Sequence, residues 1–204
     1  GKTDWSWAPL FAYFDNDGYK DLFVTNGIKK DVTDNDFKIK LASKNAAGEK
    51  MTFEEVMNMM PGIKVENYIY KNNGDLSFKK MMDKWGLNEK VNSNGASYAD
   101  LDNDGDLDLI VNNLDDIASV YENLSNEVKE NNYLKIKFNG PETNPNGLGT
   151  KVYLINDDGS VQQYQELYSS RGYISSVDNI MHFGLGKSDN VSKIITQWGD
   201  GKES

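Results

Sequence analysis

Apolar and polar residues alternate along much of the chain, a pattern typical of β-strands. Two stretches, LFAYFDNDGYKDLFVTN at 10–26 and SYADLDNDGDLDLIVNN at 97–113, align without a gap at a distance of 87 residues. Each stretch is followed by a second similar segment, at 67–78 and at 118–127, in which a tyrosine and an asparagine precede a turn. We therefore predict two repeats, each built as strand, acidic turn, strand, linker and strand.

The linker of the first repeat has helical rather than alternating periodicity. In TFEEVMNMMPG, Thr52 and Glu55 have the spacing of a capping box, and Pro61 and Gly62 end the pattern. The apolar residues recur at helical intervals: Phe53, Val56, Met57 and Met60. We predict one short inserted helix that packs on a β core. The alternative is a pliable, methionine-rich binding surface.

From about residue 131 the pattern predicts a second module of short strands. The strand-like segments are YLKIKFNG (133–140), GTKVYLIN (149–156), VQQYQELYSS (161–170) and KIITQW (193–198). Residues 157–160 predict a hairpin turn, and 139–149 predict a long loop. The final Gly-Asp-Gly turn predicts a hairpin whose second strand is missing. We interpret the chain as a piece of a longer protein, with modules at 1–128 and 129–204, the second truncated at its C-terminus.

Composition narrows the functions open to the chain. Its 204 residues carry a formal net charge of −10, with a pI of about 4.6, and include no cysteine. The acidic balance argues against nucleic acid and anionic membrane surfaces as partners. Without cysteine there is no disulfide and no thiolate-bound zinc. No apolar run approaches the roughly 20 residues that span a bilayer, and the first residues, GKTDWSW, lack the apolar segment of a signal peptide.

The acidic turn of the second repeat predicts a cation site. Carboxylates at alternate positions of a tight loop can converge on calcium, which takes six to eight oxygen ligands. The predicted ligands are Asp100, Asp102, Asp104, Asp106 (through its backbone carbonyl) and Asp108. An EF-hand does not fit, because loop position twelve is Val111 rather than glutamate and both flanks are strand-like. The number of carboxylates favours calcium over magnesium. The alternative is a solvated acidic loop.

The acidic turn of the first repeat, residues 13–21, is less complete than the turn at 100–108. Its candidate ligands are Asp15, Asp17, Tyr19 (through its backbone carbonyl) and Asp21, but position one is Tyr13. A phenol is a poor calcium ligand because its pKa is near 10. Three interpretations stay open: a weak calcium site, a site in which water replaces the missing carboxylate, or a purely structural turn.

These repeats resemble the FG-GAP or VCBS-type repeats of integrin-α-like β-propellers, and YKNNGDLSF (70–78) resembles the hairpin that follows their calcium loop. The tail resembles an ASPIC/UnbV domain, as in cartilage-acidic-protein-like proteins. Its matching segments are NGLGTKVYL (146–154), RGYISSV (171–177), HFGLG (182–186) and WGDG (198–201). Two residues depart from the family patterns: Tyr13 replaces an aspartate, and Gly199 stands where a proline is usual.

The resemblance implies an all-β fold: a partial β-propeller of about two blades with one short inserted helix, followed by a small β-sandwich-like domain. Because propellers have four to eight blades, it implies that further blades of the parent protein pack beside these two. It also implies a secreted, periplasmic or cell-surface location. The expected role is non-catalytic binding of an extracellular protein or glycan, with calcium making the blade loops rigid. The alternatives are a fragment of a carbohydrate-active enzyme and a purely structural spacer.

Other chemistry finds less support in the sequence. His182 lies in the apolar segment IMHFGLG and is expected to be a packed, hydrogen-bonded residue rather than a catalytic base. A carboxylate pair for glycoside hydrolysis stays open. The aromatic residues Trp5, Trp7, Tyr19 and Trp85 could stack on sugars, although Trp7 and Trp85 are expected in the core. Asn123 and Asn190 stand in sequences that fit N-glycosylation acceptors.

Overall fold

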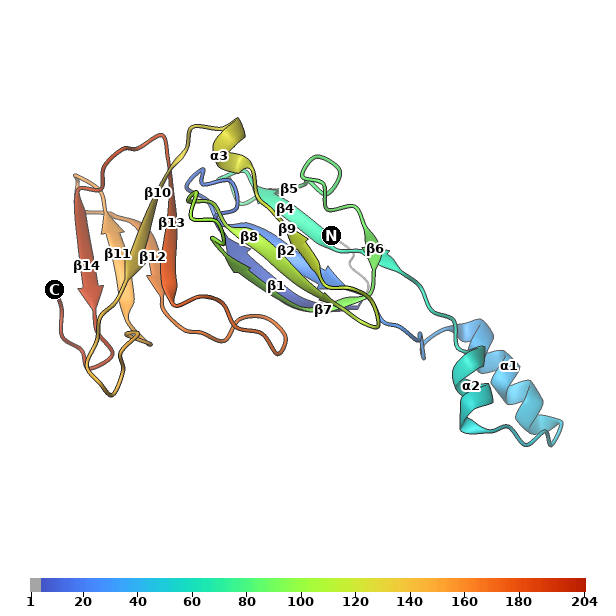
Figure 1. Cartoon of the computed structure of the whole chain (residues 1–204). Helices are drawn as coiled ribbons and strands as arrows, with labels where there is room; N and C mark the ends of the chain where they lie inside the picture. Colours follow the sequence, from blue (N-terminus) through green and yellow to red (C-terminus); the bar gives the residue numbers. More distant parts are fainter. Residues whose placement is uncertain (1–4) are drawn as a thin grey trace.

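The computed structural model describes residues 5–204, which form fourteen strands and three helices (Figure 1). The first repeat contains β1 (Ser6–Ala12), β2 (Asp21–Asn26), α1 (Asn35–Ala46), α2 (Phe53–Met59), β3 (Val65–Glu66), β4 (Tyr68–Asn72) and β5 (Phe78–Lys80). The second contains β6 (Lys90–Val91), β7 (Ser93–Ala99), β8 (Asp108–Asn113) and β9 (Ser119–Tyr121). The short helix α3 (Ser125–Val128) leads to β10 (Asn132–Lys137), β11 (Lys151–Ile155), β12 (Val161–Glu166), β13 (Ile180–Gly186) and β14 (Lys193–Gln197).

The two repeats have the same strand register, which confirms the repeat predicted from the sequence. In the first, β1 and β2 pair antiparallel with Leu10 opposite Phe23; in the second, β7 and β8 pair with Ser97 opposite Ile110. Each residue of the second pair lies 87 residues after its counterpart in the first. Both hairpins also have an irregularity in strand register at equivalent positions, between Ser6 and Pro9 and between Ser93 and Ala96. The repeats differ at the outer edge. The first sheet has the order β1-β2-β4-β5, whereas the second has β7-β8-β9.

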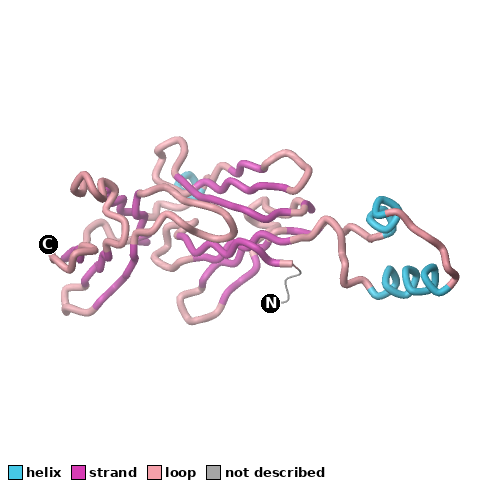
Figure 2. Tube along the Cα trace, turned by 90° about the horizontal axis from the view of Figure 1, so that it is seen from below, coloured by secondary structure: helices cyan, strands magenta, loops and turns pink. Residues whose placement is uncertain are grey.

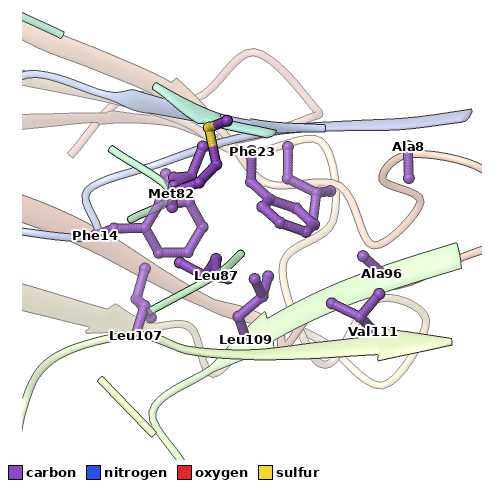
Figure 3. Packing of buried hydrophobic residues seen from close by; sticks show 12 residues of the cluster. Ala8, Phe14, Phe23, Met82, Leu87, Ala96, Leu107, Leu109 and Val111 are labelled. Carbon is purple, nitrogen blue, oxygen red and sulfur yellow. The ribbon is translucent and has the colours of Figure 1, made fainter. Parts of the chain in front are cut away.

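The apolar faces of the two sheets pack against each other to form the first core (Figure 3). Alternation along β1 directs every second side chain into this core, where Leu10 of β1 and Val111 of β8 are almost fully buried. The segment after β5 adds Met82 and Leu87 to this core. Burying each large apolar side chain contributes about 1.5–3 kcal/mol.

The C-terminal module has its own core between two small sheets. One sheet pairs β10 with β13, and the other has the order β12-β11-β14. Val152, Leu154 and Phe183 are fully buried between them. The predicted turn between β11 and β12 is confirmed: the Asn156 N–H donates to the Ser160 carbonyl at 2.9 Å. Tyr13, from the first repeat, also belongs to this second core.

β14 is the last strand of residues 5–204, and the residues after it fold back beside it. The Trp198 N–H donates to the Lys202 carbonyl at 2.8 Å, which closes the predicted Gly-Asp-Gly turn. Thr196 and Ser204 then exchange two backbone hydrogen bonds of 2.9 Å each, and Glu203 pairs with Gln197. The final residues therefore pair with the end of β14 through an isolated β-bridge.

The insertion between β2 and β4 contains two helices where the sequence predicted one. The capping box of α2 is confirmed, since the Thr52 and Glu55 side chains each accept a hydrogen bond from the other's backbone N–H. Its predicted packing on the β core is wrong. No residue of α2 is buried, Phe53 is 80% exposed, and both helices project away from the sheets (Figure 2).

Helix α1 was missed because its pattern is weak. Phe37 is its only buried residue, so the segment has no broad apolar stripe for a periodicity argument to detect. Its N-terminal cap was the available signal: the Asp34 side chain accepts a hydrogen bond from the Phe37 N–H at 2.7 Å.

The predicted all-β, partial propeller-like architecture is otherwise confirmed. Small antiparallel sheets dominate, and no sheet in residues 5–204 closes on itself. Within the same residues, no helix is both long and apolar enough to cross a membrane. The division of the chain between residues 128 and 129 stays a prediction.

Candidate metal centre

The second acidic loop connects β7 to β8 and is shaped by its own aspartates. Asn103 and Gly105 have backbone φ angles of 65° and 94°, in the left-handed region that a tight loop needs. The Asp102 carboxylate accepts a hydrogen bond from the Asp104 N–H at 3.2 Å, and Asp104 accepts one from the Asp106 N–H at 3.0 Å. The alternating Asp-x-Asp spacing therefore builds the turn as well as supplying charge.

Three of the predicted ligands converge. One carboxylate oxygen from each of Asp100, Asp102 and Asp104 lies within 4.8 Å of the others. Asp102 and Asp104 face solvent, whereas the side chain of Asp100 is only 6% exposed. Its Oδ2 accepts from the Gly105 N–H at 3.1 Å and pairs with Lys135. Its Oδ1 is buried without a partner among the described residues. A buried, unpartnered carboxylate oxygen is costly, and a cation beside it would remove that cost.

The other two predicted ligands lie outside this cluster. Asp108 accepts hydrogen bonds from the Leu101 N–H at 2.9 Å and from the Asn123 N–H at 2.8 Å, so it ties the loop to the end of β9. Asp106 is fully buried and accepts from Ser125 and Asn126. Burial raises the pKa of Asp106 to about 7. The predicted coordination through the Asp106 carbonyl stays a prediction.

The first acidic loop has nearly the same backbone. Asn16 and Gly18 have φ angles of 53° and 99°. The Asp21 carboxylate accepts from the Asn72 N–H at 2.9 Å, which reproduces the contact between Asp108 and Asn123 in the second repeat. Burial, with the nearby charge of Asp15, raises the pKa of Asp21 to about 7.

The charges of the first loop are compensated by lysines. Lys71, on β4, forms ion pairs with both Asp15 and Asp17, and the Lys129 Nζ lies 2.7 Å from an Asp15 oxygen. Burial opposes ionisation of Asp15, but its hydrogen bonds to Lys129 and Lys71 hold its pKa below the usual value. Tyr13, at position one, is buried, and burial raises its pKa, so the phenol stays protonated.

Tyr19 is half-exposed, and its ring lies against the backbone of the β4–β5 turn. A Cβ at Gly74 would approach that ring to within 2.6 Å, so the contact requires glycine. The predicted coordination through the Tyr19 carbonyl stays a prediction.

Asn16 connects the two loops to the C-terminal module, a role that the sequence analysis missed. Its Nδ2 donates to the Gly105 carbonyl at 3.0 Å, and its carbonyl accepts from the Gly186 N–H at 2.8 Å. Its Oδ1 lies 2.7 Å from Nε2 of His182, which therefore donates. The available signal was its place in the repeated Asp-Asn-Asp-Gly turn.

The expectation that His182 is packed and hydrogen-bonded is confirmed. It is 6% exposed and stacks on Tyr133, with ring centroids 5.6 Å apart. Burial and the charge of Lys135 lower its pKa to about 4, so the ring is neutral.

A cavity of about 470 Å³ lies beside the first core, between the two repeats. Its lining is largely apolar and includes Phe14, Trp85 and Leu107, with Lys84 and Glu122 among the polar residues. Asn123, a possible glycosylation acceptor, borders this cavity, but its amide donates to the Phe14 and Leu107 carbonyls. Asn190, the other candidate, is exposed.

Comparison with protein families confirms the predicted resemblance. Residues 61–111 match the FG-GAP-like repeat, and residues 140–204 match the ASPIC and UnbV family. The first match includes the second acidic loop and excludes the first. The middle of the chain is therefore similar to an FG-GAP-like repeat, and its C-terminal part is similar to the ASPIC and UnbV family.

Two curated proteins are similar to most of the chain. It is 29% identical over 139 residues to cartilage acidic protein 1 of Homo sapiens, and 28% identical over 139 residues to the protein of that name from Mus musculus. Each alignment covers 66% of this chain and 20% of the relative. The chain thus spans about a fifth of the length of these curated relatives.

Proposed function

We propose that this chain is a calcium-binding, non-catalytic recognition module of a secreted, periplasmic or cell-surface protein. Asp100, Asp102 and Asp104 hold the ion, and the ion fixes the loop between β7 and β8. The observation that carries the proposal is the convergence of these three carboxylates, together with the buried oxygen of Asp100 that lacks a partner among the described residues.

The donor set favours calcium over other metals. Carboxylate oxygens suit hard cations, and calcium tolerates the irregular geometry of a flexible loop better than magnesium does. Zinc would prefer nitrogen or sulfur ligands, whereas the cluster contains only aspartates. The neighbouring backbone carbonyls and water would complete the coordination.

Calcium at this place would make the protein more rigid where two modules meet. Lys135 of β10 pairs with Asp100, and Tyr133 packs over Gly105, so the C-terminal module borders the loop. Extracellular modules bind calcium with dissociation constants of about 0.1–1 mM. At ten times the dissociation constant, binding stabilises the folded state by about 1.4 kcal/mol.

The two matched domains support a role in extracellular recognition, with a protein or a glycan as the partner. A carbohydrate-active parent enzyme would instead turn over a sugar substrate, and a structural spacer would bind neither class of partner. Calcium-dependent retention on immobilised glycans or proteins, without turnover, distinguishes the recognition module from both.

The calcium site is tested by thermal unfolding in EDTA and in millimolar calcium. We expect calcium to raise the melting temperature by about 3–5 °C, the equivalent of the binding energy above. Asp104→Asn removes one ligand charge with little change in shape and should abolish the rise. Asp189→Asn, an exposed aspartate in the C-terminal module, is the matched control and should retain it. A chain that melts at one temperature in both buffers contradicts the proposal.

A further inference from the structure

The first acidic loop contains a cation of its own, supplied by the chain. The Lys71 ammonium group pairs with the carboxylates of both Asp15 and Asp17, and Lys129 pairs with the same Asp15 oxygen as Lys71. The Asp15 side chain is 4% exposed and that of Lys71 is 23% exposed, so solvent screens the pair only weakly. In the second loop the ion pair from Lys135 to Asp100 leaves Asp102 and Asp104 facing solvent.

The repeat shows that this lysine is a substitution at one defined place. Leu22 of the first repeat and Leu109 of the second are equivalent positions, 87 residues apart. Leu22 pairs with Tyr70 on β4, and Leu109 pairs with Tyr121 on β9, so the two tyrosines are also equivalent. The residue after the tyrosine is Lys71 in the first repeat and Glu122 in the second. The first repeat thus has a positive charge where the second has a negative one.

The C-terminal module covers the first loop. Asn131 donates to the Asp15 carbonyl at 2.8 Å, and Gly186 donates to the Asn16 carbonyl. A Cβ at Gly184 would lie 2.8 Å from the Asn16 Cα, and one at Gly186 would lie 3.0 Å from the Asp17 carbonyl oxygen. The loop and β13 are therefore in direct backbone contact.

Tyr13 completes this arrangement. At the position where the second loop has Asp100, the first loop places a buried ring in the core of the C-terminal module, beside Phe183 at a centroid distance of 6.5 Å. The residue that weakens the loop as a metal site is one that attaches the two modules to each other.

We propose that the Lys71 ammonium group takes the place of a metal ion in the first acidic loop, and that this loop is the docking site of the C-terminal module. The chain then takes up one calcium ion, at the second loop, rather than two. The inference about Lys71 concerns a different loop from the proposed calcium site and stands or falls separately; only the number of ions rests on that function.

The experiment combines calcium titration calorimetry with thermal unfolding. Wild type should bind one ion per chain, and Asp104→Asn should bind none. Lys71→Gln should lower the melting temperature in EDTA by roughly 10 °C, because it leaves Asp17 unpaired and the buried Asp15 carboxylate with Lys129 as its remaining cation. Lys79→Gln is the matched control, because Lys79 is exposed and lies directly opposite Lys71, on β5. The melting temperature of this variant should stay within about 1 °C of the wild-type value.

The outcomes separate the two proposals. Two ions in wild type, or one ion remaining in Asp104→Asn, would place calcium in the first loop and overturn the inference. Equal melting temperatures for Lys71→Gln and Lys79→Gln would also overturn it. If wild type binds no calcium and Lys71→Gln is still strongly destabilised, the calcium-binding function fails while the role of Lys71 stands.

Discussion

The two acidic loops share one backbone shape but differ in how the negative charge of their aspartates is compensated. Both use an asparagine and a glycine with positive φ, and both end in an aspartate that accepts the backbone N–H of an asparagine at or just beyond the end of the neighbouring strand. One loop is compensated by Lys71 and Lys129 and covered by the C-terminal module. The other leaves two carboxylates in solvent. The shape of such a loop is therefore separable from its capacity to hold a metal ion.

The largest expected difference between the loops is at their shared glycine. A Cβ at Gly105 would lie 1.9 Å from the ring of Tyr133, whereas the nearest atom to one at Gly18 is 4.0 Å away. Gly105→Ala should lower the free energy of unfolding by about 3 kcal/mol, and Gly18→Ala by about 1 kcal/mol from backbone strain alone. Urea unfolding of both variants measures the difference.

A double mutant provides the control for the steric explanation. If the clash with Tyr133 is the cause, Tyr133→Ala should cost less in the Gly105→Ala background than in wild type. If the losses in free energy of unfolding of the two single variants simply add in the double variant, the difference between Gly105 and Gly18 has a cause other than the clash with Tyr133.

The next largest effect is a pH dependence of the free energy of unfolding. It concerns the first loop, because Asn16 of that loop is hydrogen-bonded to His182. Burial and Lys135 lower the pKa of His182 to about 4, below the value of about 6.5 in an unfolded chain. The unfolded state therefore binds the proton more readily. The stability from the neutral ring is full above pH 6.5 and is lost as the pH falls toward 4, at up to roughly 1.4 kcal/mol per pH unit.

The measurement is the free energy of unfolding in EDTA between pH 5 and 7, for wild type and for His182→Gln. The difference between the two curves isolates the histidine from Asp21 and Asp106, whose raised pKa values give the opposite slope. Parallel curves would contradict a buried, neutral His182.

The smallest effect concerns the lysine beside the second loop. Lys135 pairs with Oδ2 of Asp100, so its positive charge repels a cation that binds the same carboxylate. Lys135→Gln should tighten calcium binding about threefold to tenfold, which corresponds to roughly 0.7–1.4 kcal/mol. Lys137→Gln makes the same charge change two residues along β10, at an exposed position, and should leave the affinity within a factor of two. Calcium titration of both variants would show whether contact or overall charge governs the effect.

Local patterns sufficed to predict most of the strands and both acidic turns. Alternation, the Asp-Asn-Asp-Gly turn and its recurrence at 87 residues depend on neighbouring positions, so they are readable without a structure. The capping box of Thr52 and Glu55 is equally local. The burial of a helix depends instead on what lies beside it, which explains why the packing of α2 was predicted wrongly.

The sequence by itself determined two acidic loops, their tight turns and the excess of negative charge at the second. Only the tertiary structure decided what compensates that charge. Lys71 and Lys129 lie 56 and 114 residues from Asp15 along the chain, and Asn16 lies 166 residues from His182. Such partners are brought together by the packing of whole modules, because the energy of an ion pair or a buried hydrogen bond depends on distance in space and on exclusion of water.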